Sequence, residues 1–162
     1  MAFLGRARTA TGAGVLATLI LVLAFGNQAF TEWVTRHTDG ATVWGWFLRV
    51  LSWPNWAFGP RDNSGSAARD LLAQDLKAIL LVVFVALILS MSAKSLVGGG
   101  GAFILGWASL VFASALAALA TAFIASHASW LGAFQSAAAG SAYGLFVGWL
   151  VGIAVAGGKS AG

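Results

Sequence analysis

The sequence contains no cysteine and few charged residues. Without cysteine there is no disulfide framework, no thiolate metal site and no cysteine nucleophile. Charged residues make up 9% of the chain and hydrophobic residues 59%, whereas soluble domains carry about 25% charged residues. Such a chain cannot cover itself with polar surface in water. We therefore expect an all-α, polytopic membrane protein that forms a single membrane domain over residues 1–162.

Positive charge is thinly spread along the chain. The formal net charge of +4 includes nine Lys and Arg residues, and no stretch of them is dense. A nucleic-acid footprint requires clustered basic residues, so nucleic acid is excluded as a partner and the charges are interpreted as topology signals. Abundant Ala and Gly with only three lysines indicate a GC-rich genome, which fits a bacterial plasma membrane.

Four apolar segments are long enough to cross the hydrocarbon core of the lipid bilayer, which needs roughly 20 helical residues. They cover residues 11–30, 76–93, 102–126 and 131–156, and residues 31–75 form a long loop. A helix that begins near Ser64 or Ser66 is expected to continue into the second segment. Lys77 is expected to extend from that helix toward the membrane surface. These segments predict a bundle of four transmembrane helices.

The first segment also has features of a cleaved signal peptide. Arg6 and Arg8 precede its apolar core, and the small residues Ala24 and Gly26 would admit cleavage. The apolar stretch continues through Phe30, which favours an uncleaved anchor. Cleavage would leave three spans and change the topology.

The positions of the charges predict an orientation. With four spans, Arg6, Arg8, Lys94 and Lys159 lie on one side in short segments, and all five acidic residues lie in the long loop. Short segments that carry Lys and Arg remain in the cytoplasm. Both termini are therefore predicted to be cytoplasmic, with residues 31–75 outside.

The long loop holds five of the eight tryptophans. A short apolar face at helical spacing ends before Pro54 and consists of Val43, Trp46, Phe47, Val50 and Leu51. A helix of this length cannot span, so we expect it to lie in the membrane interface. The loop is interpreted as an aromatic belt, a docking surface for a partner, or both. The residues concerned are Trp44, Trp46, Phe47, Trp53 and Trp56.

Small residues recur at every fourth position of the last segment: Ser136, Gly140, Gly144, Gly148, Gly152 and Ala156. In a membrane such a row, called here the glycine ladder, lets another helix backbone approach closely. One expectation is packing against the third segment, whose matching row is Ser109, Ala113, Ala117, Thr121 and Ala125. The other is packing between copies of the chain in a homo-oligomer, and periodicity does not separate the two.

Few polar residues offer candidates for chemistry. Glu32 and Arg36 have the i, i+4 spacing of a helical ion pair, and His37 with Asp39 and Glu32 forms only a weak metal-ligand pattern. Asp75 and Lys77 are the candidate transport pair, because ionisable groups in a membrane are functional candidates by default. His127 lies in the turn between the third and fourth segments and is interpreted as an interfacial residue.

Catalytic and cofactor motifs are missing from the sequence. Gly157-Gly158-Lys159-Ser160 ends like a phosphate-binding loop, but Ile153 stands where that pattern needs glycine. No catalytic, cofactor-binding or metal-binding residue is predicted. We expect a non-enzymatic structural or accessory protein that self-assembles or joins a larger membrane-protein complex. The alternative is a small oligomeric channel or transporter for a neutral or weakly charged solute.

Overall fold

The computed structural model describes residues 10–59, 65–92, 99–125 and 128–160. In these ranges the chain forms helices and no strand. The helices are α2 (Ala10–Phe25), α3 (Gln28–His37), α4 (Val43–Leu51), α5 (Gly65–Ser92), α6 (Gly99–Ala122) and α7 (Trp130–Ser160). The all-α expectation is confirmed. Arg6, Arg8, Lys94 and His127 lie outside the described residues.

Among the described residues, three helices are long and apolar enough to cross a membrane: α5, α6 and the Trp130–Gly158 part of α7. The apolar helix α2 has 16 residues, a length of about 24 Å at the helical rise. The predicted first span reached residue 30, but α2 ends at Phe25. It ends there because Asn27 starts α3 as its N-cap, with Oδ1 accepting the N–H of Phe30 at 2.8 Å.

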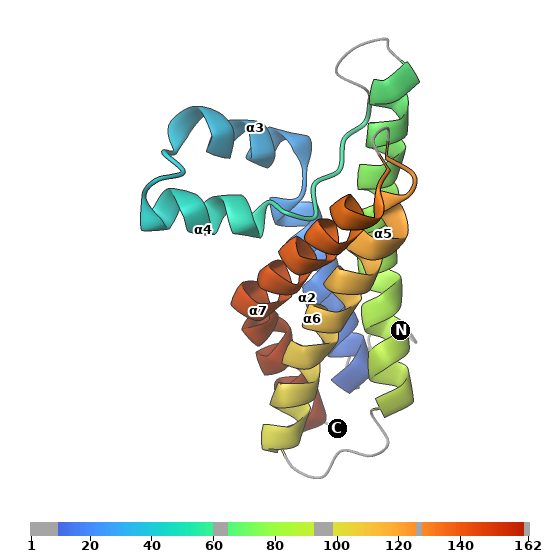
Figure 1. The fold of residues 1–162 in the computed structure, drawn as a ribbon. Coiled ribbons are helices and arrows are strands. Elements are labelled where there is room, and N and C mark those ends of the chain that lie inside the picture. The colour runs from blue at the N-terminus through green and yellow to red at the C-terminus, as the bar shows by residue number, and fades with distance from the viewer. Residues whose placement is uncertain (1–9, 60–64, 93–98, 126–127, 161–162) are drawn as a thin grey trace.

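The long helices form an up-and-down bundle (Figure 1). The chain runs along it in alternating directions through α2, α5, α6 and α7, while α3 and α4 lie across its axis at one end. The helix α5 is described from Gly65, so the last part of the predicted loop is helical. Of the two serines predicted as its start, Ser66 lies inside α5 and Ser64 lies outside the described residues. The short helix expected before Pro54 is α4.

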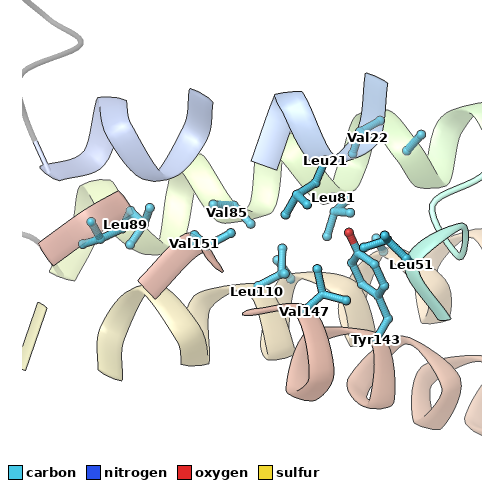
Figure 2. Packing of buried hydrophobic residues seen from close by; sticks show 14 of the residues in the cluster. Leu21, Val22, Leu51, Leu81, Val85, Leu89, Leu110, Tyr143, Val147 and Val151 are labelled. Carbon is cyan, nitrogen blue, oxygen red and sulfur yellow. The ribbon is translucent and has the colours of Figure 1, made fainter. Parts of the chain in front are cut away.

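Aliphatic side chains fill the centre of the bundle (Figure 2). Those that are at most 1% exposed include Leu81, Val85, Leu89, Leu110, Val147 and Val151. The helix α2 joins this core through a close approach at Gly14. A Cβ atom there would lie 2.5 Å from Cδ1 of Leu89 and 2.6 Å from Cγ2 of Val155. Glycine at this position lets α2 pack against α5 and α7 without displacing the side chains of Leu89 and Val155.

The four glycines of the ladder face α6. A Cβ atom on Gly144 would lie 2.6 Å from the backbone nitrogen of Val111, and one on Gly152 would lie 2.7 Å from the carbonyl oxygen of Phe103. Similar backbone approaches occur at Gly140 and Gly148. Within the chain, therefore, α6 occupies the glycine face of α7, as in the first of the two packing expectations.

The partner row on α6 differs from the predicted one. The predicted residues Ser109, Ala113, Ala117 and Thr121 are buried. However, the atoms nearest to the four glycines belong to Phe103, Trp107, Leu110, Val111, Ser114 and Ala115. Two polar contacts strengthen the pair. Ser114 Oγ lies 2.6 Å from the Gly140 carbonyl oxygen and shares its one proton between that oxygen and the Leu110 carbonyl of its own helix, and Trp107 Nε1 donates to the Leu145 carbonyl at 2.9 Å.

Candidate functional site

Residues 52–59, called here the connector, leave the end of α4 and pack into the bundle before α5 begins. The connector is not helical, and its Pro54 is fully buried. Buried non-helical backbone needs partners for its N–H and C=O groups, because they lack those of a regular helix. The contacts of the connector with α2, α5 and α7 therefore define the first candidate site.

Against α2, the connector satisfies carbonyl groups at the helix end. Trp56 donates its backbone N–H to the Gly26 carbonyl at 2.9 Å and its indole N–H to the Val22 carbonyl at 3.0 Å. The side chain of Asn27 donates to the carbonyls of Leu23 and Ala24. The Val22 carbonyl also accepts the Gly26 N–H, whereas the last carbonyls of a helix have no partner in the helix itself, and Asn27 supplies one for those of Leu23 and Ala24.

Against α5, the predicted pair Asp75 and Lys77 holds the connector from two sides. Lys77 Nζ donates to Asn55 Oδ1 at 3.0 Å and lies 4.7 Å from the centre of the Trp53 ring. Asp75 Oδ1 accepts the backbone N–H of Ala57 at 3.1 Å. Residues two apart on a helix point about 200° apart. The structure accordingly gives the two side chains separate partners and does not bring them together as an ion pair.

Against α7, the Trp53 ring stacks on the ring of Tyr143. Their centroids are 5.1 Å apart and their planes are inclined by 23°. Tyr143 is 1% exposed, and its hydroxyl has no hydrogen-bond partner among the residues that the structure describes. Figure 2 shows this hydroxyl directed toward the aliphatic side chains of Leu51 and Leu81. A buried hydroxyl without a partner costs roughly 1–3 kcal/mol.

A cleft of about 320 Å³ adjoins Lys77, between α5, the end of α6 and the start of α7. Its polar lining comes from Asp70, Gln74, Lys77, Thr121 and Ser136. Ser136, predicted as the first member of the glycine ladder, thus lines the cleft. At the other end of the ladder, Ala156 packs partly buried against the core.

The predicted aromatic surface divides into two parts. Trp44 and Trp46 on α4 are 64% and 42% exposed, and Phe47 is half-buried. Trp53 and Trp56 belong to the connector and pack against the core. The residues expected to form the apolar face of α4 also differ in burial, since Val43 is exposed and Leu51 is buried.

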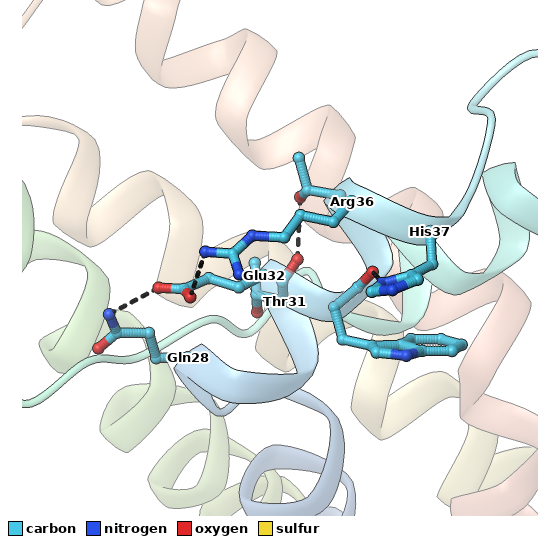
Figure 3. A network of polar contacts seen from close by, with 7 residues as sticks. Gln28, Thr31, Glu32, Arg36 and His37 are labelled. Carbon is cyan, nitrogen blue, oxygen red and sulfur yellow. Dashed lines mark hydrogen bonds and ion pairs between the residues drawn. The ribbon is translucent and has the colours of Figure 1, made fainter.

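The charged residues of α3 form a local network (Figure 3). Arg36 pairs with Glu32 at 3.3 Å, as predicted, and Glu32 also accepts a hydrogen bond from Gln28 at 2.8 Å. His37 stacks on Trp33, and Asp39 accepts the backbone N–H of Ala41. Over the part of the chain that is described, no three His, Cys, Asp or Glu side chains gather to hold a metal ion.

Several residues of the site were not singled out in the sequence. Asn55 lies in the stretch predicted as the aromatic loop, and Tyr143 lies inside an apolar span. One signal was present: Pro54 and the aromatic residues around it are unusual for a solvated connection.

Comparisons with protein-family models, with curated proteins and with solved structures find no match for this chain.

Proposed function

We propose that this chain is a non-enzymatic accessory protein of a bacterial plasma membrane. In this proposal it joins a second copy or another membrane protein through α3 and α4, called here the platform. The observation that carries the proposal is the exposure of apolar side chains on α4: 84% for Val43, 64% for Trp44 and 42% for Trp46. Aromatic side chains dominate the energetics of protein interfaces.

The glycine ladder supports this choice of surface. A row of small residues is a common means of association between membrane helices. Here α6 already occupies the four glycines, which leaves the platform as the more available surface for assembly.

Contacts within the platform and with the bundle favour a preformed surface. The Arg49 guanidinium donates to the Thr38 carbonyl at 3.2 Å, which joins α4 to the end of α3. The Trp46 ring packs edge-on against Phe146 of α7, with centroids 4.9 Å apart. A surface that is held in place before binding loses less conformational freedom when a partner docks.

The proposal includes a fourth span, α2, which would place both termini in the cytoplasm and the platform outside. The close approach at Gly14 and the capped carbonyls at the end of α2 support it. The alternating directions of α2, α5, α6 and α7 (Figure 1) agree with this topology. Retention of α2 as part of the bundle also favours an uncleaved anchor.

The test replaces Trp44 with a photo-crosslinking amino acid and irradiates intact membranes. We expect one crosslinked product of defined protein mass. The matched control carries the same amino acid at Ile104, an exposed position on α6, and should give lipid adducts only. If Trp44 also gives lipid adducts alone, the platform is a membrane-interface element and the assembly proposal is wrong.

A small oligomeric channel or transporter is the second candidate, favoured by the polar cleft beside Lys77. The aliphatic core of the bundle gives no support for a path through a single chain, so the candidate requires several copies. Swelling of proteoliposomes in glycerol is its test. Flux above that of empty liposomes, reduced in a Lys77→Met variant, would favour it over the accessory role.

A further inference from the structure

Lys77 has only neutral partners among the residues that the structure describes. These are the amide oxygen of Asn55 at 3.0 Å and the face of the Trp53 ring at 4.7 Å. The ion pair that the structure gives in the described ranges is the distant one between Glu32 and Arg36. A cation removed from water is stabilised best by an anion within hydrogen-bond distance, and an ammonium group has three donors. Lys77 is therefore suited to receive an anionic ligand.

The position of Lys77 along α5 matches the level of lipid headgroups. From Ala78 to the end of α5 at Ser92 no residue is charged, a length of about 22 Å at the helical rise. On the neighbouring hairpin, Phe123 and Trp130 pair edge-on with centroids 5.0 Å apart. Aromatic rings are enriched at the membrane–water boundary. These features place the ammonium group at the edge of the apolar layer.

The cleft beside Lys77 is amphipathic. Its volume of about 320 Å³ lies at the small end of the range for ligand pockets. Thr121, Ser136 and Gln74 contribute to its polar lining. Apart from the Trp53 ring, its apolar lining consists of small side chains from α5, from α6 and the turn after it, and from α7: Ala73, Ala118, Ala122, Ala125 and Ala139. Small side chains leave room beside the polar groups for the glycerol and first methylene groups of a lipid.

We propose that this cleft binds the phosphate group of a membrane phospholipid, with Lys77 Nζ donating to a phosphate oxygen. A lipid is favoured over free phosphate because the cleft opens beside apolar helices at the membrane boundary. Asp70 also lines the cleft, and its negative charge disfavours a doubly charged free phosphate more than a singly charged phosphodiester. The site is separate from the platform, so this proposal does not depend on the proposed assembly.

The test is native mass spectrometry of the purified full chain, titrated with phosphatidylglycerol or phosphatidylethanolamine of defined acyl chains. We expect one lipid of either class to remain on the wild-type chain. Lys77→Met should weaken its binding by about tenfold or more, because a charge-assisted hydrogen bond is lost. Ala139→Phe should weaken it similarly by filling the cleft, without altering Lys77. Arg36→Gln, a matched loss of one positive charge on the exposed side of α3, should leave binding unchanged.

A second arm adds inorganic phosphate at millimolar concentration to the lipid-bound chain. We expect the lipid to remain bound, and displacement by phosphate would overturn the assignment to a lipid. Equal lipid binding by the wild-type chain, Lys77→Met and Ala139→Phe would place any retained lipid elsewhere and overturn the proposal. If lipid binding were lost in Ala139→Phe but kept in Lys77→Met, the Lys77 ammonium group would have no role in binding the lipid. Thermal unfolding of each variant confirms that the compared chains are folded.

Discussion

The indole N–H of Trp56 donates to the carbonyl oxygen of Val22 at 3.0 Å, across 34 positions of the sequence. The backbone N–H of the same residue donates to the Gly26 carbonyl. Together these bonds cap the C-terminal end of α2 with a residue from the connector. In an apolar environment an uncapped carbonyl is costly. The connector and α2 therefore depend on each other for their positions.

Gly26→Ala is expected to disrupt this junction. A Cβ atom at Gly26 would overlap the Pro54 carbonyl oxygen and lie 2.6 Å from the Val22 carbonyl oxygen. Overpacking of this kind costs roughly 1–3 kcal/mol, and we expect the melting temperature in detergent to fall accordingly. The matched control is Gly59→Ala, where a Cβ atom would meet nothing within 4 Å. Equal melting temperatures for the two variants would contradict the arrangement.

Gly144→Ala should loosen the pair formed by α6 and α7. The added methyl group would press on the backbone of Val111, at a cost of roughly 1–3 kcal/mol. In Gly157→Ala the methyl group would enter open space, so stability should stay constant or rise by up to about 1 kcal/mol through helix propensity. Chemical unfolding in mixed micelles measures both. A Gly144→Ala chain as stable as the Gly157→Ala chain would argue against the observed packing.

Ser114→Ala should lower stability by a smaller amount. Its hydroxyl lies 2.6 Å from the Gly140 carbonyl oxygen on the neighbouring helix and from the Leu110 carbonyl oxygen on its own, so the two share its proton. Hydrogen bonds between membrane helices contribute about 0.6 kcal/mol on average. Ser90→Ala is the control, because that exposed hydroxyl donates only within its own helix, to the Leu87 carbonyl. Unfolding measured side by side should separate the two variants, with Ser90→Ala close to the wild-type chain.

Tyr143→Phe is expected to keep or increase stability. The substitution removes a buried hydroxyl that has no partner in the described structure and retains the ring that stacks on Trp53. The gain should be about 1 kcal/mol, the lower end of the cost of an unsatisfied buried group. Tyr143→Leu, which loses the stacked ring, should be less stable than the wild-type chain. A clear loss in Tyr143→Phe would show that the hydroxyl has a partner in solution.

Local patterns in the sequence were sufficient for several features. The scarcity of charge and the long apolar segments indicated a helical membrane protein, and three helices in the described part of the chain are long and apolar enough to span. The i, i+4 spacing of Glu32 and Arg36 indicated their ion pair. The apolar pattern before Pro54 indicated α4. Each feature depends on residues within a few turns of one another, where helical geometry relates spacing to contact.

Other features were decided only by the tertiary structure. The spacing of the glycines identified a face suited to close packing, but the neighbouring α6 determines what occupies it. Asp75 and Lys77 looked like a pair by their closeness in sequence, yet each holds a different residue of the connector. Trp53 and Trp56 were grouped with exposed aromatic residues and instead pack into the bundle. The sequence by itself determined the environment and the helices, because these follow from composition and short-range spacing. Only folding decided which residues meet across 20 or more positions, because those contacts depend on how whole helices pack.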